Sequence, residues 1–136
     1  MAISTYNKFN SANTRLVTDC NVTTDTFKIM LTNTAPVATN GVIADIVEIA
    51  GGNGYTAGGI DIDLTAVEVG STVEIRPDGN KVVTASGGSI PAYRYFVLAD
   101  VTTDALISYW DRGSEIALAD GDTSTITLGA TVAILS

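Results

Sequence analysis

The chain has 136 residues, of which 46% are hydrophobic, and a formal net charge of −8. These values fit one globular domain and argue against disorder, and the acidic charge argues against binding to nucleic acid or anionic lipid, which need basic patches. With no histidine and only one cysteine, Cys20, the chain cannot form a Ser-His-Asp triad or an intrachain disulfide.

Residues 1–25 are polar and rich in Asn, Thr and Ser, with neither a helical nor a strand period. We expect an extended N-terminal arm, anchored by a few apolar side chains that include Tyr6 and Phe9. Such an arm either docks on a neighbouring subunit or frays as a free terminus. The start of the chain shows no signal-peptide pattern, and no apolar run reaches the roughly 20 residues of a transmembrane helix.

Residues 26–32 (TFKIMLT) alternate, which predicts a strand with Phe27, Ile29 and Leu31 on one side. A loop follows over residues 33–40. Residues 42–50 (VIADIVEIA) fit either one or two helical turns or a strand, because apolar spacing favours the first and β-branching the second.

Residues 51–59 (GGNGYTAGG) form a glycine-rich loop around Tyr55. Ile60, Ile62 and Leu64 then alternate with polar residues, which predicts a half-buried strand with an acidic outer face. Residues 77–80 (PDGN) predict a turn, so residues 72–76 and 81–85 should pair as a hairpin.

Residues 93–99 (YRYFVLA) predict a central strand, and residues 105–110 (ALISYW) a strand that returns after a turn at 102–104. Residues 123–128 and 131–135 should form a last pair. The chain therefore predicts an all-β, single-domain β-sandwich, jelly-roll-like, with about seven or eight short strands in residues 26–136 after the arm at 1–25.

No motif for chemistry stands out. The loop at 51–59 lacks the Lys-Ser/Thr and following helix of a phosphate-binding loop. The pairs Asp61/Asp63 and Asp120/Asp122 and the turn at 78–80 carry oxygens that calcium takes, but they fit solvated faces and turns better. Tyr93, Tyr95 and Trp110 suit core packing better than a sugar-binding platform. We expect no catalytic residue, no metal site and no cofactor.

Three segments together resemble a family of small structural proteins of tailed-bacteriophage particles: residues 27–40 (FKIMLTNTAPVATN) with 52–59 (GNGYTAGG), residues 84–98 (TASGGSIPAYRYFVL) and residues 106–122 (LISYWDRGSEIALADGD). Relatives in this family tend to carry a helix-like segment before the Phe-Lys strand, whereas residues 11–24 here look extended. The resemblance implies an accessory structural role and carries over no catalytic or cofactor residue.

From this resemblance we expect a capsid decoration (cement) protein, made in the host bacterial cytoplasm, that binds the major capsid protein on the outside of the virion. It would be no enzyme, and a homo-oligomer, with a trimer suiting the three-fold positions of a capsid. Candidate partner contacts are Tyr6 and Phe9 in the arm and Asn53 and Tyr55 in the glycine-rich loop, with local packing the equal alternative for Tyr55. A tail or fibre component in host attachment and a carbohydrate-binding module remain alternatives.

Overall fold

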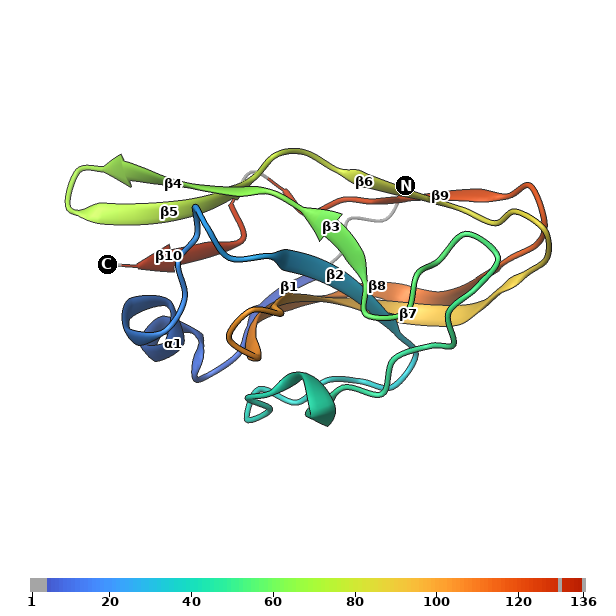
Figure 1. Cartoon of the computed structure of the whole chain (residues 1–136), viewed down its shortest axis with the longest axis horizontal. Coiled ribbons are helices and arrows are strands. Elements are labelled where there is room, and N and C mark those ends of the chain that lie inside the picture. The colour runs from blue at the N-terminus through green and yellow to red at the C-terminus, as the bar shows by residue number, and fades with distance from the viewer. Residues whose placement is uncertain (1–4, 130, 136) are drawn as a thin grey trace.

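The computed structural model describes residues 5–129 and 131–135, and nearly half of them lie in antiparallel strands (Figure 1). Two short helical segments interrupt the strands, α1 (Ala12–Thr18) and the 3₁₀ turn η1 (Ile43–Asp45). The described strands are β1 (Thr5–Lys8), β2 (Phe27–Thr32), β3 (Ile60–Ile62), β4 (Leu64–Val69), β5 (Thr72–Pro77), β6 (Lys81–Thr84), β7 (Ile90–Asp100), β8 (Ala105–Leu118), β9 (Thr123–Ile126) and β10 (Ala133–Leu135). The all-β expectation is confirmed.

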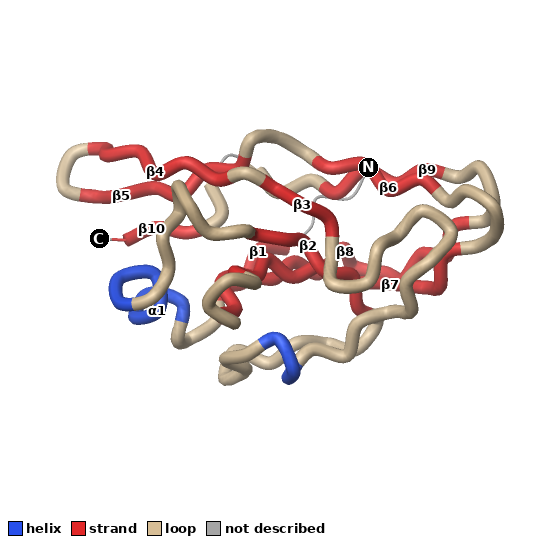
Figure 2. The backbone as a smooth tube through the Cα atoms, viewed as in Figure 1, coloured by secondary structure: helices blue, strands red, loops and turns tan. Residues whose placement is uncertain are grey.

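The strands form layers. A five-stranded sheet has the order β1-β8-β7-β2-β3, and β7 is central in it, as its aromatic sequence predicts. Two smaller sheets, β10-β5-β4 and β6-β9, lie end to end over one face of the large sheet (Figures 1 and 2). This arrangement agrees with a β-sandwich, while the jelly-roll connectivity stays a prediction.

The main core fills the space between these layers. It joins residues of the large sheet, such as Ile29, Phe96 and Trp110, to residues of the small sheets, such as Ile75 and Ile126. The rings of Phe96 and Trp110 stack with centroids 5.4 Å apart. The hydrophobic free energy gained by burying large aromatic and β-branched side chains from both layers is the main contribution that holds the layers together.

The large sheet is buried on its other face as well. Phe9, Met30, Ile46, Val97 and Leu106 belong to a second core cluster, so β2 and β7 carry apolar side chains on both faces. Residues 33–50, here called the covering segment, run across this face on the side away from the small sheets (Figure 1). The ambiguous stretch at 42–50 resolves into one turn of 3₁₀ helix and an isolated bridge between Glu48 and Thr32.

The extended N-terminal arm is wrong for the described part of residues 1–25. β1 pairs with β8 at the edge of the large sheet, and α1 lies where an extended stretch was expected. Phe9, Ala12 and Leu16 are buried in the core clusters. These few apolar side chains are enough to dock the segment, because a sheet edge and a core face are available to receive them. Residues 1–4 lie outside the described residues.

The hairpin expected between residues 72–76 and 81–85 is wrong. β5 pairs with β4 through a two-residue turn that begins at Gly70, whose φ is +62°. β10 pairs along the other edge of β5, so that no edge remains for β6. The turn at 77–80 instead carries the chain from one small sheet to the other.

The last expected pair, residues 123–128 with 131–135, is also wrong. β9 pairs with β6, and β10 pairs with β5. Val132 donates its backbone N–H to the carbonyl of Ile75, at 2.8 Å, which leads the chain into the three-stranded sheet. The two segments therefore belong to different sheets.

The regular alternation of a β-strand is broken along residues 93–96. The pairing of β7 with β8 shifts register between Tyr93 and Tyr95, as in a β-bulge. The shift turns Tyr93 and Phe96 into the same core, while Tyr95 stays half-buried.

Neither helical segment in the described residues is long and apolar enough to cross a membrane.

Candidate functional site

The glycine-rich loop at 51–59 is a tight, internally bonded structure. Gly52 and Tyr55 bridge each other through backbone hydrogen bonds, and Asn53 between them has a φ of +57°. Gly54 has a φ of +104°, and a Cβ placed on it would lie 2.0 Å from the carbonyl oxygen of Thr84. Only glycine meets both conditions, so the glycines here serve close packing against the β6 end.

Tyr55 is the anchor of this loop. Its side chain is buried, its hydroxyl accepts a hydrogen bond from the backbone N–H of Leu31 at 3.0 Å, and it donates to the carboxylate of Glu48. Glu48 also accepts the backbone N–H of Gly58 at 2.8 Å. Burial and the bond to Glu48 raise the pKa of Tyr55, so it stays a neutral donor. The packing alternative therefore describes Tyr55, and its side chain is unavailable to a partner.

Asn53 lies on the surface beside this anchor. Its Nδ2 donates to the carbonyl of Ser89 at 2.8 Å, and its own carbonyl accepts the backbone N–H of Ser86 at 2.9 Å. The loop at 51–59 is thereby tied to the loop before β7. Of the two candidates in this loop, Asn53 is the one that a partner could touch.

A shallow hollow lies beside the same loop. Its volume is about 250 Å³, and its lining combines the loop with β2, β3 and β6 through Lys28, Gly54, Thr56, Gly59, Ile60, Asp61 and Val82. Lys28 and Asp61 pair across it at 3.0 Å. With its one cation already paired to a carboxylate, the hollow offers no net charge with which to select an anionic ligand.

The two arm candidates are placed differently from each other. Tyr6 is 42% exposed, with its ring 5.6 Å from that of Trp110. Partial burial raises the pKa of Tyr6. Phe9 is fully buried, with its ring 4.9 Å from that of Tyr109, so it is a core residue and not a surface contact.

The sugar-binding platform considered for the aromatic strands is not present. Tyr93 and Trp110 are each 1% exposed, so neither ring offers a face to a ligand. Arg94 lies over the ring of Tyr95, 5.4 Å from its centroid, and occupies that face too. Core packing, the favoured alternative, is the use that Tyr93 and Trp110 have.

Most of the aspartates that were weighed as calcium ligands have other partners. Asp61 pairs with Lys28, and Asp78 pairs with Lys81 at 3.0 Å. Asp120 accepts the backbone N–H of Gly87 from the loop before β7, and Asp122 accepts that of Ala119 within its own turn. Within the described residues, none of these carboxylates joins a group of three potential metal ligands.

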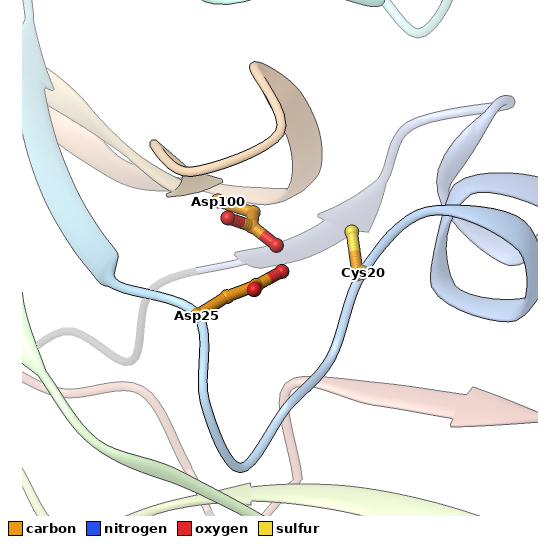
Figure 3. Close-up of side chains that lie close together, drawn as sticks. All are labelled: Cys20, Asp25 and Asp100. Atoms are coloured by element: carbon orange, nitrogen blue, oxygen red, sulfur yellow. The ribbon is translucent and has the colours of Figure 1, made fainter.

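One such group does exist among the described residues, and no sequence pattern indicated it. Cys20, Asp25 and Asp100 bring Sγ and two carboxylate oxygens within 4.8 Å of one another (Figure 3). Cys20 and Asp25 come from the connection between α1 and β2, and Asp100 is the last residue of β7. The three residues are here called the Cys-Asp-Asp cluster.

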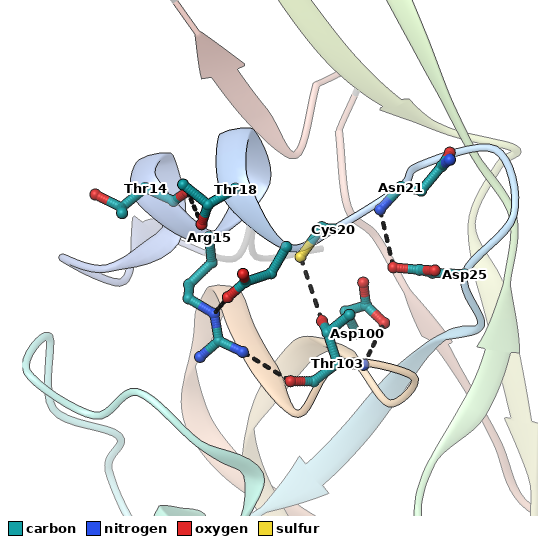
Figure 4. A network of polar contacts seen from close by, with 9 residues as sticks. Thr14, Arg15, Thr18, Cys20, Asn21, Asp25, Asp100 and Thr103 are labelled. Carbon is teal, nitrogen blue, oxygen red and sulfur yellow. Dashed lines mark hydrogen bonds and ion pairs between the residues drawn. The ribbon is translucent and has the colours of Figure 1, made fainter.

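Local bonding fixes each member of the cluster. Asp25 Oδ2 accepts the backbone N–H of Asn21 at 2.9 Å, which closes the turn between the two elements (Figure 4). Asp100 Oδ1 accepts the backbone N–H of Thr102 at 2.9 Å in the tight turn between β7 and β8. Cys20 Sγ lies 3.5 Å from the hydroxyl of Thr103. The geometry therefore depends on backbone turns and not on mobile surface side chains.

The helix is tied to the same turn. Arg15 donates to the carbonyl of Thr103 at 2.7 Å and forms an ion pair with Asp19 at 2.5 Å (Figure 4). The backbone N–H of Cys20 bonds to the carbonyl of Arg15 at 2.9 Å. Helix α1 thus positions Cys20 against the end of β7.

The two carboxyl groups have opposite environments. Asp100 is fully buried, and its burial, followed by the contact with Asp25, raises its pKa. The pKa of Asp25 is lowered by that contact and by the N–H of Asn21. Burial also raises the pKa of the Cys20 thiol to about 11. Of the two carboxyl groups, Asp100 therefore holds a proton more tightly than Asp25 does.

A different feature marks the outer surface. Three exposed valines, Val37, Val42 and Val47, lie on the covering segment. The segment itself is firmly held: Asp104 accepts the backbone N–H of Ile43 at 2.9 Å, and Leu31 accepts that of Ile49 at 3.0 Å. Apolar side chains are therefore exposed to solvent on a backbone that hydrogen bonds hold in place.

Searches against protein-family models, curated proteins and solved structures find no match to this chain.

Proposed function

We propose that this chain is a non-enzymatic structural protein of a tailed-bacteriophage particle that binds the outside of the capsid as a decoration protein. The resemblance carried by residues 27–40, 52–59, 84–98 and 106–122 supports the family. The layered β-domain supports a structural role, since such a scaffold holds loops rigidly for contact with neighbours.

The observation that carries the binding role is the set of exposed valines on the covering segment. Val37 and Val47 are more than half exposed, and Ile46 between them is buried in the second core cluster. The segment thus packs inward through one set of side chains and presents a second apolar set outward. Little ordering entropy is lost when a surface held this way docks on another protein.

The partner in this proposal is the major capsid protein, and the chain's net charge of −8 suits an electropositive coat surface. Binding at many equivalent positions would sum modest contacts into strong attachment. A trimer of this chain would place three covering segments around a three-fold position. Tyr6 and Asn53, which have exposed surface, are secondary contacts.

The first test is the copy number of this protein relative to the coat protein in purified particles, with its location determined by electron microscopy. Copies in fixed proportion to the coat protein over the whole shell are expected. A few copies confined to the tail would refute decoration and favour host attachment instead.

The second test asks whether the covering segment is the contact. A variant with Val37, Val42 and Val47 all changed to Ser should bind undecorated capsids at least tenfold more weakly. The matched control changes three valines that are exposed elsewhere, Val17, Val69 and Val82. Because both variants lose the same exposed apolar groups, equal loss of binding would rule out the covering segment as the docking surface.

A further inference from the structure

The Cys-Asp-Asp cluster contains a buried carboxyl group, that of Asp100, beside the carboxyl group of Asp25. Asp100 is 0% exposed, and its Oδ2 makes no hydrogen bond to any described residue. Its Oδ1 is used by the turn, so Oδ2 is the free end of the carboxylate. The carboxylate of Asp100 faces Asp25 and Cys20 (Figure 3). A buried carboxylate oxygen without a partner is costly unless a cation or a proton meets it.

We propose that Cys20, Asp25 and Asp100 form a binding site for one divalent transition metal ion of the zinc type. The donor set decides the class of metal. A thiolate ligand is soft and selects zinc-like ions over calcium and magnesium, which take oxygen ligands almost exclusively. Two carboxylates complete the three protein ligands, and a solvent molecule takes the fourth position of a tetrahedral site.

The spacing fits this coordination. Zinc bonds of about 2.3 Å to sulfur and about 2.1 Å to oxygen put tetrahedral ligand atoms roughly 3.4–3.6 Å apart. The three ligand atoms already lie within 4.8 Å of one another, so side-chain rotations that move these atoms by about 1 Å would bring them to coordination distance. Cys20 and Asp25 are partly exposed, which gives an ion a path in from solvent.

The ion would act as a structural cross-link. It would join the connection after α1 to the end of β7, two parts of the chain that already meet through the Arg15–Thr103 bond and the pairing of Phe27 with Asp100. Binding releases protons from the thiol and the carboxyl, since metal ligands must be deprotonated. The metal would therefore stabilise the docking of the N-terminal segment on the large sheet.

The test uses the full chain treated with chelator and then titrated with Zn²⁺ or Co²⁺. One Zn²⁺ per chain is expected, and zinc at about a hundred times its Kd should raise Tm by roughly 10 °C. Co²⁺ should give a thiolate-to-metal charge-transfer band in the near ultraviolet. That band reports cysteine ligation directly, which a nonspecific electrostatic effect cannot imitate.

The variants Cys20→Ser and Asp25→Asn should bind at least tenfold more weakly, and Cys20→Ser should abolish the cobalt band. Asp61→Asn is the matched control, because it removes an exposed carboxylate outside the cluster and should bind as the parent does. Asp100→Asn tests the buried ligand while it keeps Oδ1 for the turn.

Two results would overturn the proposal. In the first, Zn²⁺ leaves Tm unchanged and Asp100→Asn is as stable as the parent, which means that a shared proton satisfies Oδ2. In the second, Ca²⁺ or Mg²⁺ stabilises the parent and Cys20→Ser equally, which means that the carboxylates attract cations without a thiolate site.

Discussion

The hydroxyl of Tyr55 makes a sharp test of how the glycine-rich loop is held. It is the acceptor for the Leu31 backbone N–H, at a point of β2 beyond the end of its pairing with β3. It is also a donor to Glu48. Tyr55→Phe removes both bonds while it keeps the ring and therefore the packing.

The cost follows from the two bonds. A buried N–H left without an acceptor costs about 1–3 kcal/mol, and a lost hydrogen bond to a charged group costs about 1.5–3 kcal/mol. Glu48 keeps the N–H of Gly58, which reduces the second term. We expect Tyr55→Phe to lower the free energy of unfolding by about 3 kcal/mol and Tm by roughly 10 °C.

Tyr93→Phe is the matched control. Tyr93 is buried to the same degree, 1% exposed, but its hydroxyl makes no hydrogen bond to any described residue. Removing that hydroxyl should leave stability unchanged or raise it. Urea unfolding followed by fluorescence measures both variants. If Tyr55→Phe costs no more than Tyr93→Phe, the hydroxyl of Tyr55 does not hold the loop, and the reasoning fails.

Two further predictions concern backbone conformation and pH. Gly52→Ala and Gly54→Ala meet similar backbone strain, because the two glycines have φ of +119° and +104°. Only the Cβ added at Gly54 would also clash with the carbonyl of Thr84. Gly54→Ala should therefore lower the free energy of unfolding by about 1–3 kcal/mol more than Gly52→Ala, as measured by thermal or urea unfolding. Equal costs would show that the loop shifts freely. The ion pair with Arg94 lowers the pKa of Asp111, so its stabilisation is present at neutral pH and is lost as pH falls through about 3.9 and below. Asp111→Asn should therefore lower the free energy of unfolding by at most about 1 kcal/mol near neutral pH and leave it unchanged in strong acid. Calorimetry of the parent and the variant at a series of pH values measures this, and a difference that persists in strong acid would contradict the ion-pair explanation.

Local patterns in the sequence were sufficient to predict most of the strands, although β1 was missed. Alternation identified β2 and one strand from residue 60, which the structure divides into β3 and β4 in different sheets. Aromatic and β-branched composition identified β7 and β8. Glycine, proline and Asp-Gly pairs located the loops between them. These features act over a few neighbouring residues, so they can be read without knowing what packs where.

The fate of the N-terminal residues depended on tertiary contacts. Residues 12–18 have no strong helical period, yet they form α1, because Ala12 and Leu16 are buried against the core and Arg15 bonds to the β7–β8 turn. A short helix of this kind is stable only when packed. The sequence could not show the surface that receives it.

Pairing of strands and assembly of the Cys-Asp-Asp cluster were likewise decided in three dimensions. β5 pairs with β10 and β6 with β9, against the local hairpins that the turns suggested, since each strand pairs with the edge left open by the rest of the fold. Cys20 and Asp25 meet Asp100 only because Phe27 pairs with Asp100 in adjacent strands. The all-β class and the positions of most strands thus follow from the sequence, because local propensity acts over a few neighbouring residues. Which distant residues become neighbours follows only from the tertiary structure, because the free energy of packing depends on the whole chain.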